Sequence, residues 1–250
     1  MLLFRTTTLA MVAAIMFTSS HWLTASSHEV VNGLPRAELV FEPTAGQNDV
    51  KTVQGHVEYQ NPTLTGPAQW SWIGVSMTKP TNGDCHSGDT DPQFLKALRA
   101  GFMKYHNQNW NNGNTVYMFA AWIDENNNIV LEKHMAVNQM YPMRIDDYSS
   151  SIFPRSYYFR YYNGSKWKDY RVLLNDGPMH HMRCTTYGGW ASNHDQGMGT
   201  AGILYPTYRK QSGGTFTQVP FNPWHADASD PFWISHYSDP NIWLIQIGRN

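Results

Sequence analysis

The sequence is poor in charged residues. Only 15% of its 250 residues are Asp, Glu, Lys or Arg, and the formal net charge is −1. A nucleic-acid partner held through phosphate contacts needs a basic surface that neutralises phosphate charge. The charge balance argues against such a partner, and we expect none.

Cysteine is equally scarce, with only Cys85 and Cys184 in the chain. In an exported protein two cysteines most often form one disulfide bond, and a retained free thiol is the alternative. A Cys85–Cys184 bond would close a loop of about 100 residues and stabilise the fold by about 4–5 kcal/mol in the chain-entropy model, less any strain. With both sulfurs bonded, neither a cysteine nucleophile nor a thiolate metal site is expected.

Several catalytic signatures are missing. No G-x-S-x-G is present, so a nucleophile elbow is unsupported. No phosphate-binding loop or dinucleotide glycine motif is present, so we expect no nucleotide cofactor. No HExxH or similarly tight ligand pattern occurs, and no metal ligand is assigned, although a divalent metal stays open. A glycosidase needs two facing carboxylates, but all six glutamates precede residue 133 and the sequence does not pair them.

Long hydrophobic runs are confined to the N-terminus. Arg5 precedes an apolar run that ends at Phe17, is too short to cross a bilayer and is followed by small residues. This pattern is typical of a signal peptide spanning residues 1–20, with a cut after Ser27 as the alternative. We therefore expect a secreted, extracellular or periplasmic protein with no stable membrane span, in which residues 28–250 form a single β-rich globular domain; a retained N-terminal anchor is the other interpretation.

What the chain does contain is a series of short alternating or apolar segments separated by turn formers. Such a series predicts a mainly β fold, an antiparallel sandwich or a barrel-like domain. Asn163-Gly164 is the strongest of the hairpin signals. The expected strands are 37–41, 50–60, 68–77, 115–124, 129–137, 156–162, 166–174, 201–208, 215–219, 232–236 and 242–247.

One principal amphipathic helix is predicted over about residues 91–106. Asp91 is a suitable N-cap residue, and Pro92 fits the first helical turn. An apolar stripe at helical spacing follows, made of Phe94, Leu95, Leu98, Phe102 and Met103. The Asn-rich segment after His106 should end the helix.

The polar stretch 176–198 is the centre of the functional hypothesis. It holds three of the eleven histidines, Cys184 and a Gly188-Gly189-Trp190 break, and Cys85 lies in a second polar stretch. A disulfide bond would bring the two Cα atoms within about 6 Å, and a neutral imidazole beside a carboxylate is able to act as a base near pH 7. The alternative is a polar cluster hydrogen-bonded around a disulfide. The expected catalytic residues are His86, His180, His181, His194 and Asp195.

The hairpin 156–174 supplies the expected substrate-binding residues. Its first strand alternates, so that one face should enter the core while Tyr158, Arg160 and Tyr162 face outward. Tyrosine rings pack against the C–H faces of sugars, and arginine favours an acidic ligand. Trp190 completes this set. An ordinary amphipathic surface hairpin is the alternative interpretation.

These observations favour a secreted glycan-directed protein whose partner is an extracellular glycan or a cell-surface component. The enzyme hypothesis is a secreted polysaccharide-degrading hydrolase or lyase that uses histidine as general acid or base. Two alternatives remain open: a secreted toxin or adhesin that acts on cell surfaces without catalysis, since exposed aromatic rings also suit membrane interfaces, and a metal-dependent hydrolase.

Overall fold

The computed structural model describes most of the chain from Leu23 to Arg249. The described residues are 23–24, 36–41, 50–64, 66–78, 97–123, 129–135, 139–148, 155–162, 167–174, 184–192, 201–210, 214–219, 225–228, 232–239 and 242–249. The expected signal peptide lies outside them and stays a prediction. Within these ranges no helix is long and apolar enough to cross a membrane.

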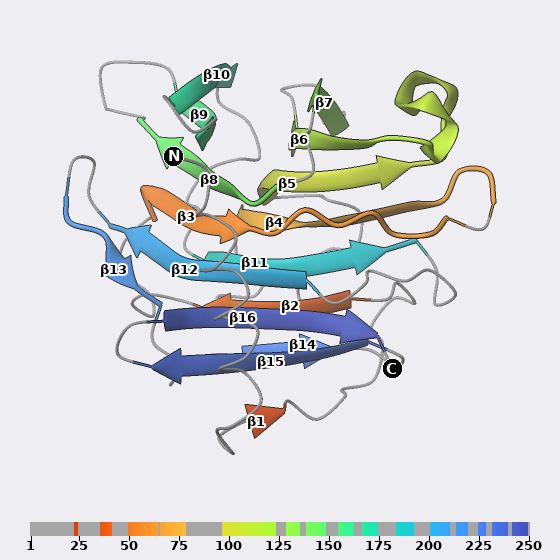
Figure 1. The fold of residues 1–250 in the computed structure, drawn as a ribbon. Coiled ribbons are helices and arrows are strands. Elements are labelled where there is room, and N and C mark those ends of the chain that lie inside the picture. Colours follow the sequence, from red (N-terminus) through yellow and green to blue (C-terminus); the bar gives the residue numbers. More distant parts are fainter. Residues whose placement is uncertain are drawn as a thin grey trace, which may run out of the picture.

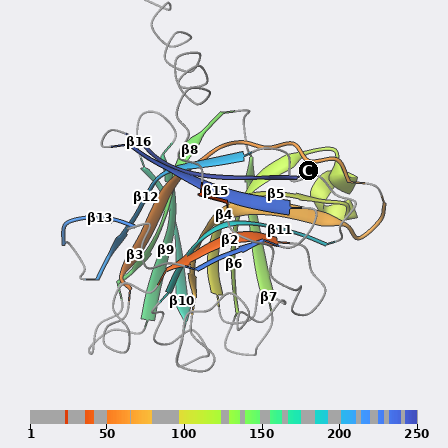
Figure 2. The ribbon, with the colours of Figure 1, turned by 90° about the horizontal axis from the view of Figure 1, so that it is seen from below.

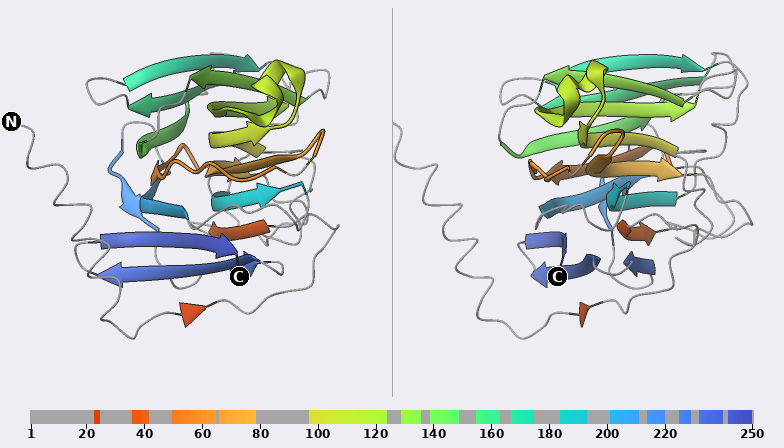
Figure 3. Two further views of the ribbon diagram at one scale, coloured as in Figure 1. Left: turned by 45° about the vertical axis from the view of Figure 1, so that its right-hand side comes forward. Right: turned by 90° about the vertical axis from the view of Figure 1, so that its right-hand side faces the viewer.

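The described strands form two antiparallel sheets (Figure 1). The first has nine strands. Their order is β1 (Leu23–Thr24), β15 (Phe232–Asp239), β16 (Ile242–Arg249), β12 (Ala201–Arg209), β3 (Thr52–Val57), β8 (Tyr141–Asp147), β9 (Arg155–Tyr162) and β10 (Trp167–Leu174), with β13 (Thr217–Gln218) paired to β12. Figure 3 shows this sheet running from the blue β15 and β16 to the green β9 and β10.

The second sheet has seven strands. Their order is β14 (His225–Ala228), β2 (Arg36–Phe41), β11 (Cys184–Ala191), β4 (Trp70–Thr78), β5 (Ala97–Tyr105), β6 (Val116–Ile123) and β7 (Ile129–Met135). Seen from below, β3, β9, β10 and β12 lie to one side of β4, β6 and β7 (Figure 2). The two packed sheets confirm the predicted antiparallel β-sandwich.

The main core lies between the sheets and follows from strand alternation, because every second side chain of each strand points inward. Val75 and Phe102 of the seven-stranded sheet belong to the same buried cluster as Ile203 and Ile245 of the nine-stranded sheet. Tyr187 also links the layers, since its hydroxyl donates a hydrogen bond to the Thr207 carbonyl over 2.9 Å. Burial raises the pKa of this hydroxyl, which therefore stays protonated.

The predicted helix over 91–106 is wrong where the structure describes it, since residues 97–105 form β5 between β4 and β6. Leu98 and Phe102 face the main core, and Arg99 and Met103 face the opposite side, yet all four are buried. A strand that is covered on both faces shows no clean alternation of apolar and polar residues, and its apolar positions also fit helical spacing. The one helical element among the described residues is the short 3₁₀ segment η2 (Gln108–Gly113).

The expected break at Gly188-Gly189-Trp190 is also wrong. These residues belong to β11, which is buried along its whole length between β2 and β4. A Cβ atom on Gly188 would collide with the carbonyl oxygen of Ala37 on β2. Glycine here permits a close approach of two paired strands and does not end one.

The remaining strand predictions are largely confirmed: the predicted strands 115–124 and 129–137 pair as β6–β7, and the predicted hairpin 156–174 forms as β9–β10. β6 is apolar on both faces and is covered on both. Four strands were missed besides β5: the two-residue β1 and the longer β8, β11 and β14. The three longer strands carry several polar or small residues in segments that were not predicted as strands.

Candidate functional site

All five predicted catalytic residues lie outside the described ranges. These are His86, His180, His181, His194 and Asp195, and their role stays a prediction. Cys184 begins β11, is buried and is not a free thiol, while Cys85 lies outside the described ranges, so the pairing of the two also stays a prediction. Among the described side chains, no group of three or more His, Cys, Asp or Glu is placed to hold a metal ion.

The face of the seven-stranded sheet that points away from the main core carries an unusual row of small residues. Gly188, Gly74 and Gly101 lie opposite one another on β11, β4 and β5, and Glu38 of β2 lies opposite Gly188. Three neighbouring strands therefore present no side chains along this row. The glycine row leaves room above the sheet for long side chains from the adjacent rows.

Arg99 forms an ion pair with Glu38 in this space. The distance from Arg99 Nη1 to Glu38 Oε1 is 3.5 Å, and the two side chains are only 2% and 1% exposed. Burial lowers the pKa of Arg99, and the charge of Glu38 opposes that shift. Arg99 Nη1 also donates a weak hydrogen bond to Ser76 Oγ over 3.4 Å. A buried charge pair of this kind is costly to desolvate, so its presence needs a structural or functional reason.

Two indole rings border the pair. Trp72 and Trp190 lie opposite each other on β4 and β11, and the Arg99 guanidinium carbon is 4.7 Å from the centroid of the Trp72 ring and 5.4 Å from that of Trp190. Such cation–π contacts are strongest where water is excluded. Glu38, Ser76, Arg99, Trp72 and Trp190 are called the Arg99 centre from here on.

Trp190, one of the expected substrate-binding residues, is therefore a buried neighbour of Arg99, only 2% exposed. Its contact with a substrate stays a prediction. Trp72 belongs to the same apolar cluster, which lies on the outer side of the sheet. Trp72 is therefore packed within the protein and offers no exposed platform for a sugar.

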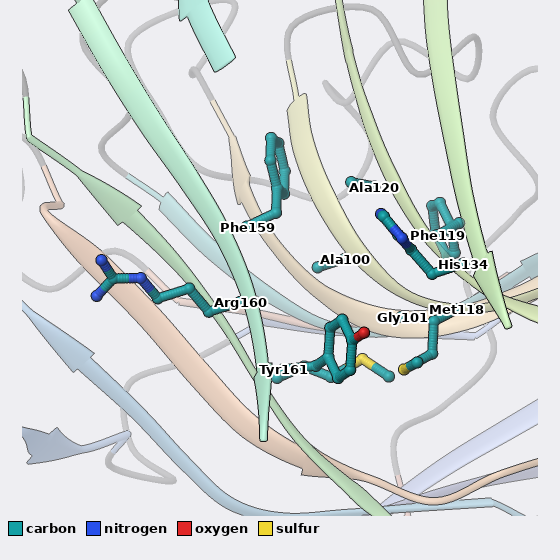
Figure 4. A pocket seen from close by; sticks show the side chains of 10 residues that line it. Ala100, Gly101, Met118, Phe119, Ala120, His134, Phe159, Arg160 and Tyr161 are labelled. Atoms are coloured by element: carbon teal, nitrogen blue, oxygen red, sulfur yellow. The ribbon is translucent and has the colours of Figure 1, made fainter. Parts of the chain in front are cut away.

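A different polar group occupies the outer face of the nine-stranded sheet. Tyr157 and Phe159 enter the core as the alternation predicts, whereas Tyr158, Arg160 and Tyr162 lie on the opposite side and are partly exposed. A cavity of about 180 Å³ lies between the sheets and is lined in part by Phe159 and Tyr161. Figure 4 shows these two side chains on one side of β9 and the Arg160 side chain directed away from them. The predicted orientation of the hairpin is confirmed.

Arg160 is one of three arginines that converge on a single buried carboxylate, that of Asp146 on β8. Arg144 Nε lies 2.6 Å from Asp146 Oδ2, Arg160 Nη1 lies 3.0 Å from the same oxygen, and Arg209 Nη2 lies 2.8 Å from Oδ1. The Thr52 hydroxyl lies 2.6 Å from Oδ1. These five residues are called the Asp146 cluster.

Sequence reasoning missed both groups apart from Arg160 and Trp190. Glu38 was one of six glutamates that the sequence does not pair, and Arg99 lay in the predicted helix, off its apolar stripe. Arg144 lies two residues before Asp146 on β8, whereas Arg209 comes from β12, which strand pairing through β3 brings to Asp146. The usable signal was the glycine in each of the segments around residues 74, 101 and 188, because glycine within a strand marks a close approach or a bend.

No family model and no curated protein matches the chain. Two crystal structures of scytalido-glutamic peptidase are similar to it in fold. The one with a transition state analog inhibitor has a TM-score of 0.50 at 11% sequence identity and covers 87% of this chain and 98% of that chain. The one with a peptide based transition state analog has a TM-score of 0.47 at 11% identity, with the same coverage. At this identity the likeness concerns the fold: the chain shares the two-sheet β-sandwich of that peptidase.

Proposed function

We propose that this protein is a hydrolase of peptide bonds whose reaction centre is the Arg99 centre. The observation that carries the proposal is the Glu38–Arg99 ion pair, which is buried over a row of glycines on the outer face of the seven-stranded sheet. The substrate class comes from the peptidase with the similar fold. The N-terminal apolar run supports action outside the cell membrane.

The two charged groups have complementary parts in amide hydrolysis. The Glu38 carboxylate would accept a proton from the attacking water and then pass it to the leaving nitrogen as the C–N bond breaks, and acid–base catalysis of this kind contributes about 10²–10⁴-fold. The Arg99 guanidinium would stabilise the negative charge that develops on the carbonyl oxygen. Trp72 and Trp190 hold the guanidinium in place and exclude water from it, so that its charge acts through a medium of low dielectric. Substrate must separate the ion pair for these steps to occur.

The test compares wild type with Glu38→Gln and Arg99→Lys on a denatured protein substrate between pH 3 and 8, with cleavage products identified by mass spectrometry. The proposal expects cleavage by wild type and a loss of kcat of about 100-fold or more in Glu38→Gln. Arg99→Lys keeps the charge but loses the planar guanidinium, and should lower kcat while the protein stays folded. Glu132→Gln on β7 makes the same chemical change away from the centre and should keep full activity.

Unchanged kcat in folded Glu38→Gln would remove Glu38 from the reaction. Cleavage lost in the histidine variants at positions 86, 180, 181 or 194, with Glu38→Gln active, would instead support the histidine hypothesis. Circular dichroism and thermal unfolding of each variant separate a catalytic loss from a folding defect.

A second candidate function is polypeptide binding without hydrolysis. The specific observation that favours it is that the Arg99 guanidinium already contacts Glu38, Ser76 and both indoles, so the carboxylate is engaged within the protein. Under this proposal wild type yields no cleavage products across the whole pH range but retains the denatured protein in a pull-down assay. This candidate differs from the toxin or adhesin of the sequence analysis, which stays a prediction.

A further inference from the structure

The Asp146 cluster lies on the opposite sheet from the Arg99 centre and has no part in the proposed reaction. We propose that it is the core of a binding site for an acidic polysaccharide, in which the arginines bind the carboxylates of uronic acid residues and the neighbouring aromatic rings pack against the sugars. This site lies on the outer face of β8, β9 and β12 and does not depend on the proposed hydrolysis.

The first argument is charge. Three guanidinium groups face one carboxylate, which leaves an excess of two positive charges among these described side chains. The adjacent Lys51–Asp147 pair, with 2.7 Å between Nζ and Oδ2, is neutral as a pair. On β10, strand register places Arg171 opposite Tyr158 and Asp169 opposite Arg160, so the sequence adds no net charge at these two positions. The excess is positive in a chain whose net charge is −1, so the face attracts an anionic ligand.

The second argument is preorganisation. Asp146 is only 1% exposed, whereas the arginine side chains around it are 12–15% exposed. The buried carboxylate thus holds the guanidiniums from within while part of each reaches the surface. Arg209 is fixed further because its Nη2 lies 2.8 Å from Thr52 Oγ1. Arginines held in place lose little conformational entropy when they bind a carboxylate through two parallel hydrogen bonds.

The third argument is the aromatic surround, which favours a sugar over an acidic peptide. The Arg160 guanidinium carbon lies 4.9 Å from the Tyr158 ring centroid and 5.3 Å from that of Tyr148, and Tyr148 is 42% exposed. Arg209 lies 4.5 Å from the Phe216 ring at the other side of the cluster. Rings that alternate with cations match a polymer whose units each carry one apolar C–H face and one carboxylate.

The same face extends beyond the cluster, as a polymer site requires. Gln54 of β3 lies opposite Arg144, and His56, two residues further along β3, contacts the Tyr205 ring with 5.3 Å between centroids. Tyr205 is the other large exposed ring among the described residues besides Tyr148. Exposed rings therefore lie at two places along the face, with the arginines near one of them.

Titration calorimetry with de-esterified oligogalacturonide tests the proposal. Cello-oligosaccharide of equal length is the uncharged control, and oligoglutamate of equal charge is the acidic-peptide control. The proposal expects binding of oligogalacturonide alone, weakened at least 10-fold when salt is raised from 50 mM to 500 mM, because the contacts are partly exposed charges. No binding of oligogalacturonide, or equal binding of oligoglutamate, would overturn it.

Three variants locate the site. Arg160→Gln should weaken oligogalacturonide binding at least 10-fold. Tyr148→Ala, at an exposed ring whose removal leaves the core intact, should also weaken it, which a site of charge alone would not show. Lys104→Gln removes one positive charge from the other sheet and should bind like wild type; equal weakening by Lys104→Gln would mean that only net charge matters. Loss of peptide cleavage leaves these expectations unchanged, so the two proposals fail separately.

Discussion

Gly74 and Gly101 lie directly opposite each other on β4 and β5, and neither position has room for a Cβ atom. A Cβ atom on Gly101 would enter the carbonyl oxygen of Ile73, and one on Gly74 would enter that of Ala100. Both collisions are with backbone, which cannot move aside without disrupting the strand pairing. The absence of side chains at these two positions leaves space above the sheet for the Arg99 side chain.

We therefore predict that Gly101→Ala destabilises the protein by about 1–3 kcal/mol, the usual cost of overpacking a well-packed interior. The midpoint of chemical unfolding measures this. Gly66→Ala is the matched control, because a Cβ atom there meets only the Gln69 side chain at 3.7 Å. Equal midpoints for the two variants would show that β4 and β5 separate easily.

The buried ion pair predicts that a single variant loses much more stability than the double variant. Arg99→Met leaves the Glu38 carboxylate buried without its cation, and breaking a buried pair in this way costs about 3–5 kcal/mol. A Glu38→Met/Arg99→Met double variant removes both charges and should recover most of that loss, since apolar replacement of a buried pair is often neutral. Chemical unfolding of the three proteins measures the coupling; a double variant as unstable as Arg99→Met would argue against a direct interaction.

Glu58 predicts a pH dependence of stability. Burial raises its pKa, and the hydrogen bond that it accepts from the Gly202 N–H, 2.8 Å from Glu58 Oε2, partly opposes the shift. Since the folded state holds the proton more tightly than the unfolded state, the contribution of Glu58 is present below the unfolded pKa and is lost as the pH rises through the folded pKa.

Glu58→Gln should remove this part of the pH dependence. Between about pH 4 and pH 7 the wild type should lose stability relative to the variant, because glutamate ionises in this range and glutamine does not. Thermal unfolding of both proteins across the range measures the difference. A difference that is constant with pH would show that Glu58 titrates as it does in the unfolded chain.

The sequence was most informative where one face of a strand meets solvent. The pairing of β9 with β10 and the orientation of β9 were predicted correctly, because Asn163-Gly164 indicated a hairpin and Tyr157 and Phe159 alternate with partly exposed residues. The prediction for β5 was wrong for the opposite reason. Leu98 and Phe102 face one buried side and Met103 faces the other, so apolar and polar residues do not alternate along this strand. Whether both faces are covered depends on how the sheets pack, which a single segment does not encode.

The functional centres were harder to predict because they depend on strand register. Glu38 and Arg99 come from strands that are not even neighbours, since β11 and β4 lie between β2 and β5. Arg160 was identified as a ligand-binding residue from its hairpin, but Asp146, which holds it, lies on β8 and was assigned to no element. Local patterns found one member of the Asp146 cluster. Arg144 and Asp146 share the unpredicted strand β8, and the pairing of distant strands supplies Thr52 and Arg209.

The position of β2 also shapes how the protein acquires its fold. Residues 36–41 pair on one side with residues 184–191 and on the other with residues 225–228. The first strand of the seven-stranded sheet in the chain can therefore pair only after these later segments have been synthesised. Sheets assembled from such remote segments fold slowly, commonly in milliseconds to seconds. Until then, the unpaired backbone N–H and C=O groups of β2 are able to form hydrogen bonds with the wrong strands. A polypeptide that ends before residue 225 leaves one edge of β2 unpaired.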